Sequence, residues 1–174
     1  MRNVAIIGMS FRFPGTDRES YWADLMAGRN LVTEVDPSRW DLESFRHPRR
    51  SNRGTSYTFA AGTLGDVTGF DAGFFGISPR EAAQMDPQQR LMLELSWEAF
   101  EHAGIKPSAV RGSACGVYVG ISSGDYGMRM ADDLGAIDSL MITGNTSSIT
   151  ANRISYVFDL RGPSMAIDLS LIHI

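Results

Sequence analysis

The sequence contains one serine, one cysteine and three histidines whose types or spacing could carry covalent chemistry. The run Gly120-Ile121-Ser122-Ser123-Gly124 has the spacing G-x-S-x-G. On a sharp turn between a strand and a helix, this spacing exposes a serine hydroxyl to an acyl carbonyl, so Ser122 is a candidate nucleophile of a serine hydrolase. The order of a hydrolase triad would place its acid at Asp159 or Asp168 and its base at His173.

The non-catalytic alternative for residues 120–124 is a flexible turn beside a pocket. Asp125-Tyr126-Gly127 is a poor helix start, and this favours the turn. Cys115 precedes a predicted strand, where only Arg111 could favour its thiolate, so we interpret it as a structural thiol. A single cysteine excludes an internal disulfide and a multi-cysteine metal site. The histidines are scattered without metal-ligand spacing: His47, His102 and His173.

A strand followed by glycine at residues 4–8 is also the start of a dinucleotide-binding motif. The following residues, Gly8-Met9-Ser10-Phe11-Arg12-Phe13, lack the second and third glycines that a pyrophosphate needs for its close approach. We therefore interpret Gly8 as a residue that lets the strand pass a neighbouring element.

Composition limits the class of partner. The 174 residues are 43% hydrophobic and 21% charged, which is ordinary for a globular domain. The net charge of −4 argues against a nucleic acid or an anionic membrane as partner. No apolar run approaches the ~18 residues of a membrane-spanning helix, and no signal peptide is recognisable. We expect a cytoplasmic protein.

The elements that would position the reactive residues alternate between strand and helix. Apolar runs predict strands at residues 4–7, 116–121 and 165–167. A first helix is predicted around Trp22, Leu25 and Met26, and it ends at Gly28. A second helix is predicted after Ser78-Pro79, and a third runs from Asp86-Pro87 to about residue 103. A fourth helix is predicted over residues 146–158.

The remaining segments are predicted as loops. Residues 29–65 form a long excursion with an edge hairpin near residues 57–61, and a polar segment follows the glycine/serine turn at residues 120–124. Strands separated by helices indicate an α/β layered sheet with right-handed crossovers.

Several segments, in order, resemble the ketosynthase domain of modular type I polyketide synthases. They are residues 4–9, 11–15, 36–41, 70–82, 85–90, 116–120, 143–145 and 160–164. The blocks Phe70–Ala82 and Met85–Arg90 are the most specific. The resemblance covers residues 3–168.

This resemblance implies a thiolase-like fold, in which two related α/β halves stack into an αβαβα sandwich, and the chain would be an incomplete first half. It also implies a β-ketoacyl synthase of polyketide or fatty acid biosynthesis. An acyl group moves from the phosphopantetheine thiol of an acyl carrier protein to a cysteine, and a malonyl-type extender decarboxylates and attacks the thioester. The domain binds no cofactor of its own, and the intact domain is a homodimer.

The catalytic residues of the resembling family have no counterpart in this chain. Asp168 matches the aspartate that precedes Thr-Ala-Cys-Ser-Ser in the family, but Leu169 departs from that threonine, and the cysteine would fall at Leu171. The family's two histidines lie further downstream. We therefore expect residues 1–168 to be the N-terminal part of a ketosynthase domain that is inactive by itself. Residues 169–174 match one reading frame of a transposon-end sequencing adapter, and we interpret them as an artefact.

The segment before the helix at residues 146–158 lies near the dimer interface in the family and reaches the partner's acyl pocket. Met141, Thr143 and Asn145 are the candidates for that role. Packing of the interface alone is the alternative for these residues. A second alternative for the whole chain is a carrier-protein-binding decoy without catalysis.

Overall fold

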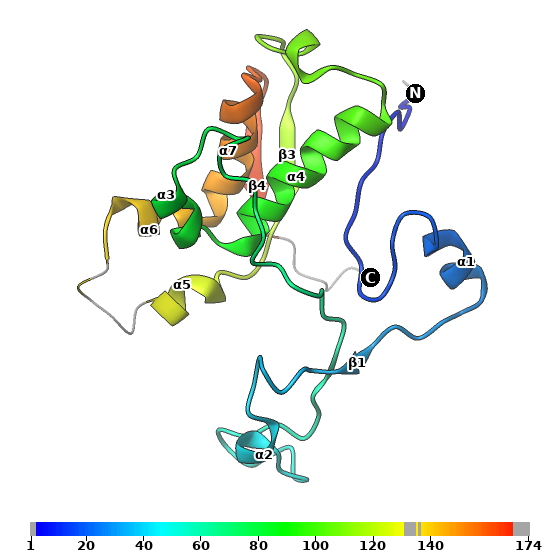
Figure 1. Cartoon of the computed structure of the whole chain (residues 1–174), viewed down its shortest axis with the longest axis vertical. Coiled ribbons are helices and arrows are strands. Elements are labelled where there is room, and N and C mark those ends of the chain that lie inside the picture. The colour runs from blue at the N-terminus through cyan, green and yellow to red at the C-terminus, as the bar shows by residue number, and fades with distance from the viewer. Residues whose placement is uncertain (1–2, 131–134, 136, 169–174) are drawn as a thin grey trace. The chain divides into compact units, whose positions relative to one another are not determined.

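The computed structural model describes residues 3–130, 135 and 137–168 (Figure 1). The chain divides into two compact units. One unit is Phe11–Asp66, and the other joins Met1–Ser10 to Val67–Ile174.

The smaller unit contains little regular structure. Its elements are α1 (Tyr21–Met26), β1 (Thr33–Glu34), α2 (Leu42–Phe45) and β2 (Ala60–Ala61). The predicted first helix is confirmed. The edge hairpin expected near residues 57–61 is not formed there, because β2 pairs antiparallel with the distant strand β1. Asp24 of α1 is buried, where its carboxylate pairs with Arg29 and accepts a hydrogen bond from Thr16.

The larger unit contains the predicted α/β core. Its elements are α3 (Pro79–Gln84), α4 (Pro87–His102), η1 (Pro107–Ala109), β3 (Val117–Gly120), α5 (Asp125–Met130), α6 (Ser139–Asn145), α7 (Ser147–Phe158) and β4 (Ser164–Ile167). Ser78 and Asp86, which precede two of the predicted helices, cap them: the Ser78 hydroxyl accepts from the Glu81 amide, and the Asp86 carboxylate accepts from the Gln88 amide.

Strands β3 and β4 form a parallel pair, with Val117 opposite Ser164 and Val119 opposite Ala166. In Figure 1 the pair lies behind α4 and α7, and α7 supplies the crossover between the strands. Side chains alternate across the pair, so that Val117 and Val119 are buried in a core with residues of both helices, among them Leu93, Ile154 and Phe158.

The opposite face of this strand pair is uncovered. Tyr118, Met165 and Ile167 are exposed there, next to one another along the register of β3 and β4. Parallel sheets normally have both faces covered. A further layer of structure is therefore missing from this face within the described part of the chain.

The prediction of a strand at residues 4–7 is wrong, because residues 3–12 form no strand. This segment has no strand partner among the described residues and follows α4 instead: the Met9 amide donates to Nδ1 of His102, 3.0 Å away. Val4 is 93% exposed and Ile6 is 88% exposed. Gly8 does pass a neighbour closely as expected, since a Cβ there would collide with the carbonyl oxygen of Ala99.

None of the helices in the described residues is both long and apolar enough to cross a bilayer. Among the same residues, no three His, Cys, Asp or Glu side chains gather into a group that could hold a metal ion.

Candidate functional site

Ser122 lies in an exposed turn directly after β3, and α5 begins three residues later. The expectation that residues 125–127 start a helix poorly is therefore wrong. The Ser123 hydroxyl supplies part of the reason, because it donates to Oδ1 of Asp125, 2.9 Å away, and ties the turn to the helix start.

The other members of the candidate hydrolase triad do not gather at Ser122 in the described part of the chain. Asp159 ends α7 in a left-handed conformation and pairs with Arg161, with 3.6 Å between Oδ1 and Nε. Asp168 is exposed after β4. His173 lies outside the described residues. Among the described residues, Ser122 makes no hydrogen bond to a base, so the structure assembles no serine triad there.

The three acyl-pocket candidates come from one helix, α6, although the sequence predicted only a polar segment there. Asp138 caps this helix by accepting from the amides of Leu140 and Met141. An aspartate followed by Leu140-Met141-Ile142 was the signal that could have identified the helix.

The three candidates differ in how they are held. Nδ2 of Asn145 donates to the Gln84 carbonyl at 3.0 Å and to the Met141 carbonyl at 2.8 Å, which fixes the end of α6 on the end of α3. The Thr143 side chain is exposed, and its hydroxyl donates back to carbonyls of its own helix. Met141 is half-buried. Thr143 therefore faces outward, while Asn145 anchors the segment.

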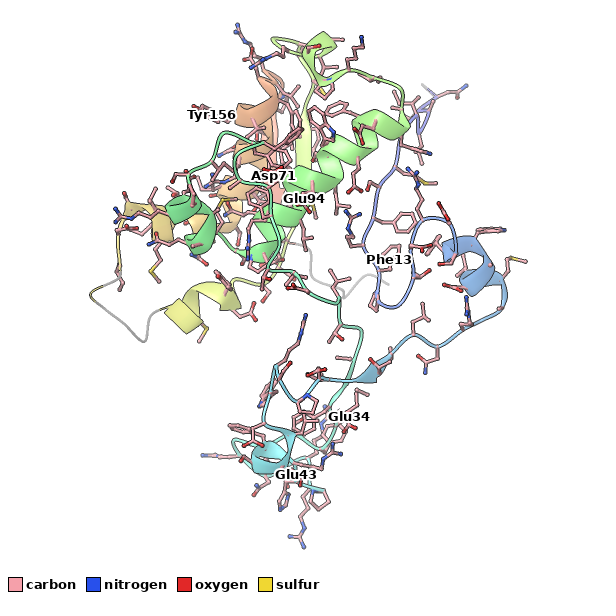
Figure 2. The ribbon with its side chains drawn as sticks, in the orientation of Figure 1. Phe13, Glu34, Glu43, Asp71, Glu94 and Tyr156 are labelled. Atoms are coloured by element: carbon pink, nitrogen blue, oxygen red, sulfur yellow. The ribbon has the colours of Figure 1, made fainter. Side chains whose placement is uncertain are left out.

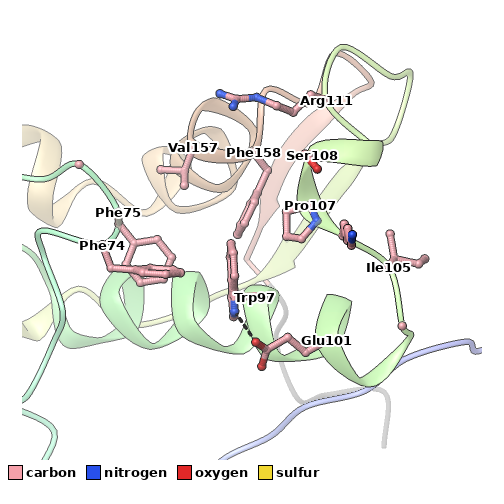
Figure 3. A pocket seen from close by; sticks show the side chains of 13 residues that line it. Phe74, Phe75, Trp97, Glu101, Ile105, Pro107, Ser108, Arg111, Val157 and Phe158 are labelled. Carbon is pink, nitrogen blue, oxygen red and sulfur yellow. Dashed lines mark hydrogen bonds between the residues drawn. The ribbon is translucent and has the colours of Figure 1, made fainter.

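A pocket of about 830 Å³ lies elsewhere in the larger unit (Figure 3). Aromatic rings dominate it: Phe74 meets Trp97 edge to face, with ring centroids 4.6 Å apart, and Phe158 lies beside Trp97. Nε1 of Trp97 donates to Oε1 of Glu101 at 2.8 Å, drawn dashed in Figure 3. The lining includes no cysteine or histidine. This pocket therefore has the chemistry of an apolar groove and not that of an acyl-transfer centre.

A smaller pocket, of about 330 Å³, includes Cys115 in its lining. The thiol is exposed, and its Sγ lies 3.8 Å from the carbonyl oxygen of Gly116. No histidine lines this pocket, so its lining provides no imidazole base for a cysteine nucleophile.

Known proteins resemble this chain over nearly its whole length. The family described as "Beta-ketoacyl synthase, N-terminal domain" matches residues 1–169. A phenolphthiocerol/phthiocerol polyketide synthase of Mycobacterium tuberculosis is 48% identical over 167 residues, which are 95% of this chain and 11% of that protein. Polyketide synthase GfsE of Streptomyces halstedii is 46% identical over 168 residues, which are 95% of this chain and 4% of that protein.

Solved ketosynthases share the fold. An oxazolomycin ketosynthase domain from Streptomyces albus superposes with a TM-score of 0.82 at 36% identity, over 94% of this chain and 28% of that one. The ketosynthase from module 6 of the bacillaene synthase of Bacillus subtilis gives a TM-score of 0.77 at 38% identity, over 94% of this chain and 26% of that one. The chain spans about a tenth or less of these curated relatives and about a quarter of the solved domains. It has the thiolase-like α/β fold of these structures, as predicted, and it belongs to the β-ketoacyl synthase family as the N-terminal part of a ketosynthase domain.

Proposed function

We propose that the chain is part of an enzyme that catalyses decarboxylative condensation of acyl and malonyl-type thioesters. Both substrates would be carried on the phosphopantetheine of an acyl carrier protein, in polyketide or fatty acid biosynthesis. The observation that carries this proposal is the family match over residues 1–169.

The catalytic cysteine of the complete domain would lie just beyond β4. Condensation needs a thiolate nucleophile, and a thiol at a helix N-terminus after a buried strand has a depressed pKa. It also needs donors that stabilise the enolate formed on decarboxylation. The family places its cysteine at the position of Leu171, which lies outside the described residues. Since that position holds leucine, we infer that residues 169–174 are a non-family tail and that this chain alone does not condense.

The described residues would supply scaffold and part of the acyl pocket. We infer that the rest of the domain covers the exposed face made by Tyr118, Met165 and Ile167, because a layered fold buries both faces of a parallel sheet. We place Met141, Thr143 and Asn145 at the acyl pocket or at the interface of a homodimer. Such an enzyme would work in the cytoplasm without a cofactor of its own.

The test uses the complete domain, which we define as residues 1–168 of this chain continued into the remainder of a ketosynthase domain. Incubated with a labelled acyl thioester, the complete domain is expected to form an acyl-enzyme, and then to release a β-ketoacyl product when malonyl carrier protein is added. Substitution of the cysteine that follows Asp168 should abolish both steps. Labelling that survives this substitution but disappears in Ser122→Ala would favour the hydrolase hypothesis instead.

A pH prediction arises from the cap of α6. Backbone hydrogen bonding from Met141, and further bonding from Arg80, lower the pKa of the Asp138 carboxyl below its ordinary 3.8. Because the folded-state pKa is depressed, the carboxylate stabilises the fold above the unfolded-state pKa, and this contribution is lost as pH falls through the folded value. Asp138→Asn should therefore lower the melting midpoint of the complete domain at neutral pH.

The difference between Asp138→Asn and the unchanged complete domain should shrink as the pH is lowered from about 5 to about 3. Thermal melts of both proteins across this range measure it. A difference that is constant across the range would show that the carboxylate charge has no part in the cap. Arg80 donates to Asp138 from 2.7 Å through an exposed side chain, so Arg80→Gln should have only a small effect.

A further inference from the structure

A buried glutamine joins the start of α4 to the end of α6. The Gln89 side chain is 2% exposed. Its Nε2 donates to the carbonyl oxygen of Thr143 at 3.2 Å and to that of Thr146 at 3.4 Å. An amide nitrogen has two hydrogens, so both are directed at the backbone of one short segment.

The oxygen of the same amide is fixed from the other side. Nε of Arg153, on α7, donates to Oε1 of Gln89 at 2.9 Å, and Nη1 of Arg153 donates to Oε1 of Glu81 at 2.5 Å. The Arg153 side chain is only 10% exposed. A guanidinium can only donate, so the amide has one workable orientation. A flipped amide would set its oxygen against two carbonyl oxygens.

Neighbouring bonds tie the same two segments together. The Asp86 amide donates to the Gly144 carbonyl at 2.9 Å, and Nδ2 of Asn145 donates to the Gln84 carbonyl at 3.0 Å. Residues 84–89 thus hold residues 143–146 through these two bonds and through the two bonds from Gln89. Only the Gln89 bonds come from a side chain of α4. The Gln89 amide and its Arg153–Glu81 support form a polar clamp between three helices and this segment.

We propose that Gln89, oriented by Arg153 and Glu81, is a positioning residue that sets where residues 143–146 lie and thereby tunes how the enzyme accepts its acyl substrate. This inference rests on the proposed function, which places Thr143 and Asn145 at the acyl pocket or dimer interface. Gln89 itself is buried beneath this segment and acts through its backbone.

Gln89→Glu in the complete domain is the direct test. The variant keeps the size of the side chain and an acceptor for Arg153, but it removes both donors to residues 143–146. We expect the KM for the acyl thioester to rise about tenfold while kcat for loading stays within about twofold. Amide hydrogen exchange in a peptide covering residues 139–146 should become about tenfold faster.

Two further variants separate positioning from general stability. Arg153→Lys keeps the charge, but its single ammonium group cannot reach both Gln89 and Glu81, so it should also raise KM. This variant tests the inference even if the Gln89→Glu domain fails to fold. Ile154→Val removes one methyl group from the core beside Arg153 and should leave KM unchanged.

Two outcomes would overturn the inference. One is a Gln89→Glu domain whose KM and exchange rates match those of Ile154→Val. The other is an unchanged exchange rate at residues 139–146 in both Gln89→Glu and Arg153→Lys. If the unchanged complete domain takes no acyl group at all, the proposed function fails, while the exchange comparison still decides whether Gln89 positions the segment.

Discussion

Purified without the rest of a ketosynthase domain, the 174-residue chain is expected to aggregate or to remain molten and to form no acyl-enzyme. The uncovered face of the β3–β4 pair exposes apolar side chains, among them Tyr118 and Met165, that the rest of the domain would have to bury. Tyr156 on α7 is also 87% exposed and projects away from its helix (Figure 2).

Size-exclusion chromatography would measure the association state of the isolated chain, and circular dichroism in the far and near ultraviolet would measure its secondary and tertiary structure. We expect helical signal without a near-ultraviolet tertiary signal or a cooperative melt. The complete domain is the control and should melt cooperatively. A soluble monomer of the isolated chain with a sharp melting transition would contradict the expectation, and it would revive the hypothesis that the chain is a carrier-protein-binding decoy.

Gly162→Ala is expected to destabilise the complete domain by about 3 kcal/mol, through overpacking of backbone against backbone. A Cβ on Gly162 would lie 2.5 Å from the carbonyl carbon and oxygen of Cys115 and 2.6 Å from the carbonyl oxygen of Ala114. None of these atoms can move without moving the loop that leads into β3. The start of β3 and this loop are tied to the turn that precedes β4, because the Gly162 amide donates to the Cys115 carbonyl (3.0 Å) and the Val117 amide donates to the Pro163 carbonyl (2.8 Å).

Urea unfolding of the complete domain measures the loss. Gly69→Ala is the matched control, because nothing lies within 4 Å of a Cβ at Gly69, and it should change the free energy of unfolding by no more than about 0.5 kcal/mol. Equal effects of the two substitutions would mean that the close approach at Gly162 does not hold β3 and β4 together.

The elements that the sequence predicted well are those with local signals. Ser78 and Asp86 cap α3 and α4 through bonds to amides no more than three residues away, and α4 begins at Pro87 as expected. The prediction of a strand at residues 4–7 was wrong because a strand depends on a distant partner, and the described chain provides none. Helix α6 was missed because its cap, Asp138, lies in a polar stretch that resembles a loop.

The candidate site could be predicted only in part, for a similar reason. The resemblance pointed to Asn145, and the structure gives that residue an anchoring bond to the end of α3. Nothing in the sequence indicated that Gln89, Arg153 and Glu81 come together, because Arg153 lies 64 residues from Gln89 and 72 residues from Glu81. Long-range pairing of this kind depends on how α3, α4 and α7 pack.

The most direct test of the central claim is to amplify the source locus and read the DNA beyond codon 168. We predict that codons for Thr-Ala-Cys-Ser-Ser follow Asp168, with histidine codons further downstream, so that the cysteine replaces Leu171. A native transcript that encodes Leu169 to Ile174 and then stops would contradict this prediction, because the condensing chemistry would then have no place in this protein.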